Sequence, residues 1–150
     1  IFNHYNMRKD LIVSKSVIIN ADSDKIWKTL TDPEIIKEYL FGTETLTDWK
    51  EGSDIVFQGE YEGKKYRDHG VILENINNSK ISYSYWSGFS GLEDKPENYS
   101  VITYSLNPFS ENSVEFTWTQ QGFADEDAYK HSGSGMQEFI ERIKNIAERS

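Results

Sequence analysis

The sequence predicts a single α+β domain with a curved antiparallel sheet of about six strands, two short helices after the first strand and one long C-terminal helix. Three observations lead to this prediction. Strand-like segments and short polar turns alternate from residue 43 to residue 121. Apolar residues recur at helical spacing over the last part of the chain. The 150 residues contain no internal repeat and no linker, and a chain of this length can bury a substantial core.

The composition narrows the classes of function. A formal net charge of −9 argues against nucleic acid as a partner, because proteins that bind the phosphate backbone need a basic face. No apolar run approaches the roughly 18 residues that suggest a membrane span, so no span is expected. Cysteine is absent, which excludes thiolate catalysis and favours a cytoplasmic location. Neither a phosphate-binding glycine loop nor a G-x-S-x-G motif occurs, and we expect no cofactor and no catalytic nucleophile.

The chain begins with a predicted tail and a strand. Met7, followed by Arg-Lys-Asp, is typical of a natural start, so residues 1–6 are interpreted as an upstream extension and residues 1–11 as an N-terminal tail. Residues 10–21 are rich in β-branched side chains and predict the first strand. The domain itself is expected to span residues 12–150.

Two short helices are predicted directly after this strand. Asp22 or Ser23 can cap the first helix. Asp32 can cap the second, with Pro33 at the first helical position, where a missing N–H costs nothing. The apolar sides of the two helices are expected to carry Ile26, Trp27, Leu30, Ile35, Ile36, Tyr39 and Leu40.

The strands that follow are separated by turns of recognisable composition. Gly63 marks a hairpin turn, residues 87–99 form a longer polar loop, and Asn107-Pro108 indicates a turn over residues 107–113. Apolar residues alternate with polar ones at period two in residues 81–86 and again in residues 114–120. The strands are expected at residues 55–61, 66–76, 81–86, 99–106 and 114–120.

The chain ends in a predicted amphipathic helix. Its apolar side is one continuous stripe formed by Met136, Phe139, Ile140, Ile143, Ile146 and Ala147. Three consecutive acids, residues 125–127, precede it. A catalytic pair of carboxylates would need opposed environments that separate their pKa values, whereas acids at the start of a helix cap it and complement its dipole. We therefore interpret the acids as a helix start.

The three histidines give no indication of a metal site. His4 lies in the predicted tail, and neither His69 nor His131 has the spacing of metal ligands. His69 stands beside Gly70 in a predicted strand and could face the interior as a hydrogen-bonding group for a ligand. The alternative is a surface histidine without a special role.

Four motifs in this order resemble one family. They are IWKTLTDPEIIKEYL at residues 26–40, WKEGSDIVF at 49–57, GVILENINNSKISYSYW at 70–86 and WTQQGFADEDAYKHSGSGMQEFIERI at 118–143. Together they resemble the START-like, or birch pollen allergen-like (SRPBCC), superfamily, and within it the homologues of the activator of heat-shock protein 90 ATPase. The resemblance covers residues 12–148 and implies the helix-grip fold, in which a curved antiparallel sheet, here of about six to seven strands, wraps around the long C-terminal helix. The family places a Gly-Trp pair where this chain has Gly135-Met136, so its ligand preference cannot be transferred.

The small residues of the Ser-Gly-Ser-Gly segment, residues 132–135, indicate a space between sheet and helix. Each glycine in a helix costs about 1 kcal/mol relative to alanine, and an unfilled space costs more. Either the aromatic side chains of the sheet fill this space or a ligand does. An apolar space with a few polar edges is the usual composition of a pocket. The residues predicted to line it are Tyr39, Phe41, His69, Tyr83, Tyr85, Phe116, Trp118, Gly133, Met136 and Ile140.

Three functions remain open at this point. The preferred one is noncatalytic binding of a small apolar or aromatic molecule between the sheet and the C-terminal helix. The resemblance implies a second, a co-chaperone-like module that contacts a chaperone. The third is an enzyme of the cyclase or hydrolase type, for which only His69 and the tyrosines could act as acid or base, and no constellation assembles them.

Overall fold

Seven antiparallel strands form one open sheet in the order β1-β7-β6-β5-β4-β3-β2. The computed structural model describes residues 6–149, and His4 lies outside them with the rest of residues 1–5 of the predicted tail. From β2 to β7 each strand pairs with the next one along the chain, and β1 pairs with β7, so that β1 and β2 are the two edge strands. The strands are β1 (Arg8–Ile19), β2 (Glu44–Leu46), β3 (Asp54–Tyr61), β4 (Lys64–Ile76), β5 (Lys80–Tyr85), β6 (Ser100–Ser110) and β7 (Ser113–Phe123).

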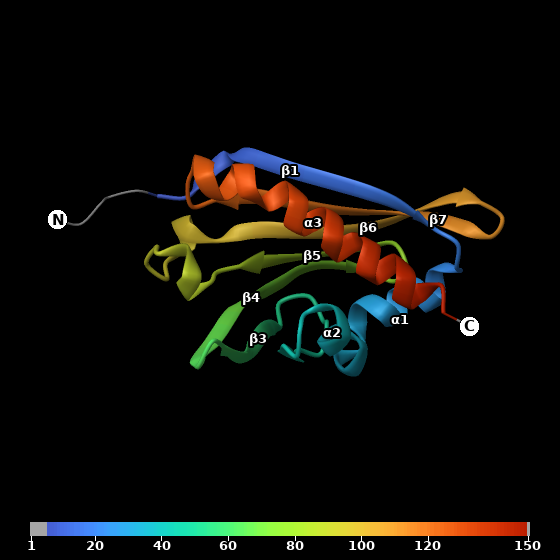
Figure 1. The fold of residues 1–150 in the computed structure, drawn as a ribbon, viewed down its shortest axis with the longest axis horizontal. Coiled ribbons are helices and arrows are strands. Elements are labelled where there is room, and N and C mark those ends of the chain that lie inside the picture. The colour runs from blue at the N-terminus through green and yellow to red at the C-terminus, as the bar shows by residue number, and fades with distance from the viewer. Residues whose placement is uncertain (1–5, 150) are drawn as a thin grey trace.

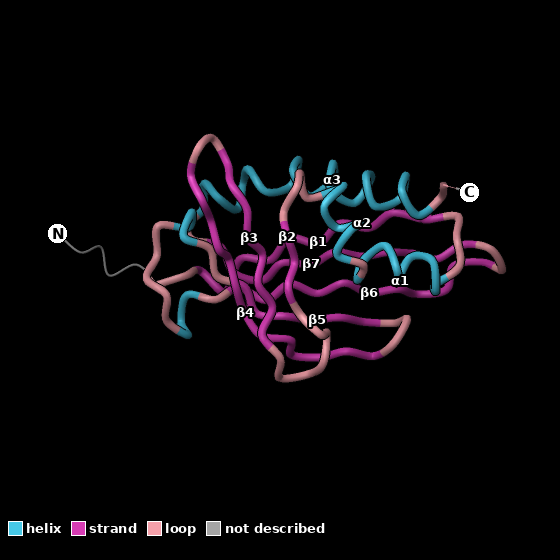
Figure 2. The backbone as a smooth tube through the Cα atoms, turned by 90° about the horizontal axis from the view of Figure 1, so that it is seen from below, coloured by secondary structure: helices cyan, strands magenta, loops and turns pink. Residues whose placement is uncertain are grey.

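The sheet is curved, and the helices gather on one side of it. Helix α3 (Glu126–Ala147) runs along the sheet beside β1, while α1 (Ser23–Thr31) and α2 (Pro33–Tyr39) lie near its C-terminal end (Figure 1). The hairpin of β3 and β4 rises at one end toward the level of α3, as Figure 2 shows. This arrangement confirms the predicted α+β architecture, with a long C-terminal helix held against a curved sheet.

The helices begin where the capping residues predict. Asp22, Asp32 and Asp125 each accept a hydrogen bond from a backbone N–H in the first turn, which leaves one fewer unsatisfied donor at each helix start. The carboxylate of Asp125 accepts from the N–H of Ala128 at 2.8 Å. The acids at residues 125–127 therefore form the start of α3, with Asp125 as its cap.

Among the boundaries that differ from the sequence expectations, two have a clear physical reason. Strand β1 starts at Arg8, which pairs with Phe123, so residues 8–11 belong to the sheet rather than to a tail. The predicted turn at residues 107–113 is shorter, because β6 continues through Pro108 to Ser110 and the chain reverses over residues 111–112. Pro108 is tolerated there because β6 extends beyond the last paired residue of β5, which leaves that side of the strand without a partner.

The core lies between the sheet and the C-terminal half of α3. Phe116 of β7 is fully buried, and Ile140 and Ile143 of α3 are buried with it. Every residue of α3 that is buried lies from Met136 onward. Among the described residues, none of the helices combines the length and the apolar character that crossing a membrane would need.

Candidate functional site

A cavity of about 400 Å³ lies between the concave face of the sheet, α3 and the loop after α2. This volume falls within the range of pockets that hold small molecules. Aromatic side chains supply much of its wall and a few polar groups interrupt them. The lining residues are Tyr39, Leu40, Phe41, Thr43, Phe57, Tyr66, Asp68, Tyr83, Tyr85, Ile102, Tyr104, Trp118, Gln120, Gly135, Glu138, Phe139 and Arg142.

Three tyrosines at the base of the cavity are buried and hydrogen-bonded. The hydroxyls of Tyr83 and Tyr104 lie 2.9 Å apart, and the hydroxyl of Tyr39 donates to the carbonyl of Thr29 at 3.0 Å. Burial, together with the nearby Tyr104, raises the pKa of Tyr39 and Tyr83 well above the usual value. Burial raises the pKa of Tyr104 to about 12. All three therefore remain neutral phenols at neutral pH.

One buried carboxylate faces the cavity from β4. Asp68 is 7% exposed, and one of its oxygens, Oδ2, accepts a hydrogen bond from the hydroxyl of Tyr85 at 2.5 Å. Burial, and after it the charge of Asp68, raises the pKa of Tyr85, so this phenol stays a donor. The other oxygen, Oδ1, is buried and has no hydrogen-bond partner in the described part of the chain. A buried polar atom without a partner is uncommon and calls for an explanation.

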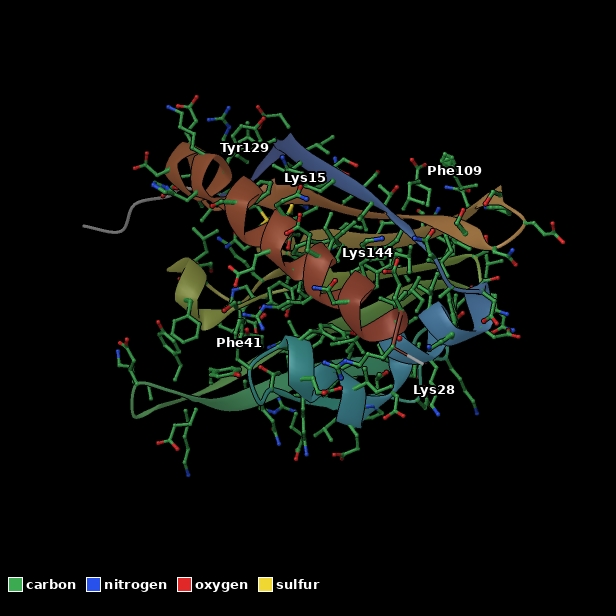
Figure 3. The ribbon with its side chains drawn as sticks, turned by 45° about the vertical axis from the view of Figure 1, so that its right-hand side comes forward. Lys15, Lys28, Phe41, Phe109, Tyr129 and Lys144 are labelled. Carbon is green, nitrogen blue, oxygen red and sulfur yellow. The ribbon has the colours of Figure 1, made fainter. Side chains whose placement is uncertain are left out.

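The mouth of the cavity is formed by the loop after α2 and one face of α3. Phe41 is 75% exposed and projects toward α3, where the guanidinium carbon of Arg142 lies 4.5 Å from its ring centroid (Figure 3). Phe41 has a φ of 52°, a left-handed conformation that is uncommon for a bulky side chain. Arg142 also donates to the carboxylate of Glu138 at 3.1 Å.

Half of the residues predicted for the pocket line this cavity. They come from α2, from the following loop and from two strands of the sheet, β5 and β7. Trp118 contacts the helix, with 4.4 Å between its ring centroid and that of Phe139. Their role in binding a ligand stays a prediction. The five residues are Tyr39, Phe41, Tyr83, Tyr85 and Trp118.

The other five lie elsewhere. Phe116, Met136 and Ile140 are buried in the core beneath the cavity, and none of them lines it. Gly133 faces the side chain of Lys15 on β1, whose Cε would lie 3.7 Å from an added Cβ. Figure 3 shows Lys15 on β1, alongside α3.

His69 also lies away from the cavity. Side chains alternate between the faces of a strand, so Asp68 faces the cavity and its neighbour His69 faces the other way. His69 there contacts the loop over residues 87–99: its Nε2 lies 2.9 Å from a carboxylate oxygen of Asp94, and its Nδ1 lies 3.4 Å from the hydroxyl of Tyr99. These contacts attach the loop to β4.

The glycine that borders the cavity is Gly135 rather than Gly133. A Cβ added at Gly135 would meet no atom within 4 Å, so the helix leaves open space at this position. The Ser-Gly-Ser-Gly segment at residues 132–135 therefore borders the cavity only at its rim and only through its last residue, Gly135. Reading the apolar stripe of α3 backward from Met136 selected the wrong glycine, because Gly133 continues that stripe toward β1.

Sequence reasoning missed the polar members of the site, above all Asp68. The signal that could have found it is the alternation of β4, in which Tyr66, Asp68 and Ile72 share a face and Ile72 is buried. An acid on the apolar face of a strand is unusual and needs a partner. Trp118 and Arg142 also line the cavity, and two of their atoms, Nε1 of Trp118 and Nε of Arg142, are buried without a hydrogen-bond partner in the described residues.

The described residues contain no group of three or more His, Asp or Glu side chains that could hold a metal ion. The arrangement suits recognition of an organic molecule instead: aromatic walls for contact area, and a small number of polar atoms for orientation. Fold and site together define a helix-grip domain, in which a curved sheet and a long C-terminal helix enclose a cavity.

Comparison with known proteins identifies the family within this class. The sequence profile of the family described as Activator of Hsp90 ATPase homolog 1-like protein matches residues 20–148. The chain therefore belongs to this family, as its four motifs predicted. No curated protein sequence matches the chain.

Solved structures show the same architecture. The solution structure of ChR145 from Cytophaga hutchinsonii is 43% identical, with a TM-score of 0.79 over 92% of this chain and 94% of that one. The crystal structure of MLL2253 from Mesorhizobium loti is 22% identical, with a TM-score of 0.74 over 93% and 98%. CalU16 from Micromonospora echinospora is 18% identical, with a TM-score of 0.69 over 91% and 76%. The last two share the fold, and their low identity carries no further argument.

Proposed function

We propose that the protein binds a small aromatic or apolar molecule in the cavity between the sheet and α3, without catalysing a reaction on it. The observation that carries this proposal is a space of about 400 Å³ walled by aromatic side chains and open at the rim beside Gly135. A folded protein gains nothing from such a space by itself, because unfilled volume lowers stability. A bound molecule would supply the missing contacts.

The chemistry of the lining supports binding rather than catalysis. A general acid or base works best when its pKa lies near the working pH. The pKa values of the cavity tyrosines lie further from neutral pH than usual, because burial raises the pKa of Tyr83 and Tyr85. His69, the other candidate for acid–base chemistry, lies on the opposite face of β4. The cavity thus offers fixed hydrogen-bond donors and aromatic contacts.

Titration calorimetry with two-ring aromatic compounds tests the proposal. Naphthalene, indole and 6-methoxy-2-acetylnaphthalene are added to the purified protein, and the melting temperature is followed in parallel. A ligand that binds only the folded state raises the melting temperature as its concentration exceeds Kd. We expect saturable binding of one molecule per chain. Native mass spectrometry of the protein taken directly from its cells would show whether a small molecule is already bound.

Two results would contradict the proposal in whole or in part. If no compound of the panel binds saturably, and the protein from cells carries the mass of the bare chain, the cavity is not a binding site for this class of molecule. If a compound binds and is also consumed, the noncatalytic part of the proposal fails, and the product identifies the reaction.

The family description supports a second candidate, which is contact with a chaperone of the Hsp90 class. Its test is independent of the cavity. The ATPase rate of the chaperone from the same cells is measured with rising amounts of this protein, and stimulation that saturates would support the contact. An unchanged rate at saturating concentration would remove it.

A further inference from the structure

Three charged side chains line the cavity, and their charges do not balance. Two of them are acids, Asp68 and Glu138, and the third is Arg142. Arg142 and Glu138 form an ion pair at the mouth, where the guanidinium donates to the carboxylate at 3.1 Å. Their side chains are 40% and 65% exposed, so solvent screens both charges. The excess negative charge of the cavity wall is therefore that of Asp68.

The charge of Asp68 has no cation beside it. The side chain is buried, and its one hydrogen bond within the described part of the chain comes from the neutral phenol of Tyr85. No Lys, Arg or His of the described residues forms an ion pair with it. Oδ1 is enclosed by protein, so a molecule in the cavity cannot hydrogen-bond to that atom. The charge still acts on such a molecule, because the Coulomb interaction needs no contact and is strongest where water is excluded.

The walls of the cavity suit a positive charge as well. Nine of the seventeen lining residues are Tyr, Phe or Trp, so a group placed almost anywhere in the cavity lies beside a ring. The face of an aromatic ring attracts a cation, most strongly where the cation has lost its water. The rings do not share one orientation, since Tyr83 is inclined to Tyr104 at 83° and Tyr104 to Trp118 at 62°. An aromatic enclosure with one uncompensated carboxylate in its wall is a site for an organic cation.

We propose that the bound molecule is an organic cation, with an ammonium group on an aromatic or apolar body. The aromatic rings contact this molecule, and the charge of Asp68 attracts its ammonium group. This inference rests on the proposed function, and it specifies the chemical class of the ligand. It also makes carboxylates such as fatty acids poor ligands, because they would meet a like charge in a poorly hydrated space. The net charge of −9 acts in the same direction at longer range.

The size of the cavity sets the strength of this effect. A charge inside a space of about 400 Å³ lies within roughly 8 Å of the wall that holds Asp68. At this separation and an effective dielectric constant of about 20, the attraction between opposite charges changes a Kd by about thirtyfold. The hydrogen bond from Tyr85 disperses part of the charge of the carboxylate, so we expect an effect of at least about tenfold.

Two ions of opposite charge test the preference. (2-Naphthylmethyl)trimethylammonium and 2-naphthylacetate share a ring system and are similar in size, and both lose water on entering the cavity. The quaternary ammonium has no N–H group, so a preference for it reports charge and not a hydrogen bond. Calorimetry measures the ratio of their Kd values, with 6-methoxy-2-acetylnaphthalene as the neutral reference. For the natural chain we expect the cation to bind at least about tenfold more tightly than the anion.

The variant Asp68→Asn gives the decisive comparison. The amide removes the charge, while its oxygen keeps the hydrogen bond from Tyr85. The preference for the cation should fall by at least about tenfold, and the Kd of the neutral reference should stay the same. Asp94→Asn is the control, since it removes the same charge from a carboxylate that lies outside the cavity beside His69, and it should keep the natural ratio.

The outcomes separate this inference from the proposed function. If the neutral reference binds the natural chain and the cation has no advantage over the anion, the cavity binds aromatic molecules without regard to charge, and the inference is wrong. It is equally wrong if Asp68→Asn keeps the preference, or if Asp94→Asn loses as much of it, because Asp68 is then not its source. If Asp68→Asn no longer binds the neutral reference, the variant has lost the cavity, and the ratio in the natural chain alone decides. If none of the three compounds binds the natural chain, the proposed function fails, and this inference fails with it.

Discussion

Replacing Gly135 by leucine should raise the stability of the protein and weaken its binding of aromatic compounds. Gly135 lies inside α3 at the rim of the cavity, and a Cβ there would meet no atom within 4 Å. Most stabilising substitutions leave binding untouched, and most that block a pocket strain the fold. Leucine at this position should affect binding without straining the fold, because the added side chain enters open space.

The size of both effects follows from the structure. A helical glycine costs about 1 kcal/mol relative to alanine, and leucine is nearly as good a helix former as alanine. For a domain of this length that gain raises the melting temperature by about 2–4 °C. The leucine side chain then occupies part of the space that a ligand needs. Crowding of this kind costs about 1–3 kcal/mol, so the Kd should rise by about fivefold or more.

Two further variants isolate the contributions. Gly133→Ala gains the same helix propensity but faces Lys15 at an ordinary contact distance of 3.7 Å, away from the cavity, so it should stabilise without changing Kd. Gly135→Ala should stabilise equally and affect binding little. Thermal unfolding by circular dichroism measures the melting temperature, and calorimetry with 6-methoxy-2-acetylnaphthalene measures Kd. A lower melting temperature for Gly135→Leu, or a Kd equal to that of Gly133→Ala, would refute the reasoning.

The remaining predictions concern stability. Tyr39, Tyr83, Tyr85 and Tyr104 are buried and have a raised pKa in the folded state, so the stability that they contribute is complete below about pH 10. It is lost as the pH rises toward the folded pKa, by about 1.4 kcal/mol per pH unit for each tyrosine. Urea titrations from pH 9 to pH 11.5 measure this slope, which should be about one quarter smaller in Tyr83→Phe; an equal slope would contradict it. Glu148 has a lowered pKa, first because of its hydrogen bond with Lys144 and then because it accepts the N–H of Asn20. Its contribution to stability is therefore present above its unfolded pKa and is lost as the pH falls through the lower pKa of the folded state. Glu148→Gln should therefore cost about 0.5–1 kcal/mol at pH 7 and nothing at pH 3, and a cost that is independent of pH would point to another cause. Phe116→Ala should cost about 3–5 kcal/mol by chemical denaturation, because the ring is fully buried. Phe89→Ala, at a ring that is 60% exposed, should stay within about 0.5 kcal/mol, and comparable losses in the two variants would mean that the core lies elsewhere.

Much of the fold could be predicted because its signals are local. The three aspartate caps, Asp22, Asp32 and Asp125, act on the next turn of backbone, so the sequence around each one is sufficient to place a helix start. Strand β2 escaped prediction because its three residues are too few to show a period, and it forms only through pairing with β3. The turn at Pro108 was predicted too long for a related reason. Whether a proline ends a strand depends on the neighbouring strand, which the local sequence does not reveal.

The site was harder to predict than the fold, because it depends on which face of a strand or helix each side chain occupies. A shift of one residue along β4 exchanges the two faces of the strand, and it separates His69, which was predicted, from Asp68, which lines the cavity. Aromatic residues were placed better than polar ones. Tyr83 and Tyr85 alternate with serines, so their common face could be recognised. Trp118 of β7 was predicted to line the cavity, whereas nothing along the sequence indicates that Arg142 of α3 lines it too.

The uneven burial of α3 has a consequence for motion. Its C-terminal half carries all of its buried residues and is also attached to β1 by Lys144, whose ammonium donates to the carbonyl of Ile18 at 2.6 Å (Figure 3). The first ten residues, 126–135, bury none and contain two glycines. Local unfolding starts where few apolar contacts must be broken. Amide hydrogens near Ser134 should therefore exchange with solvent well before those near Ile143, and the same fraying would widen the rim beside Gly135 and give a molecule a path into an otherwise rigid interior.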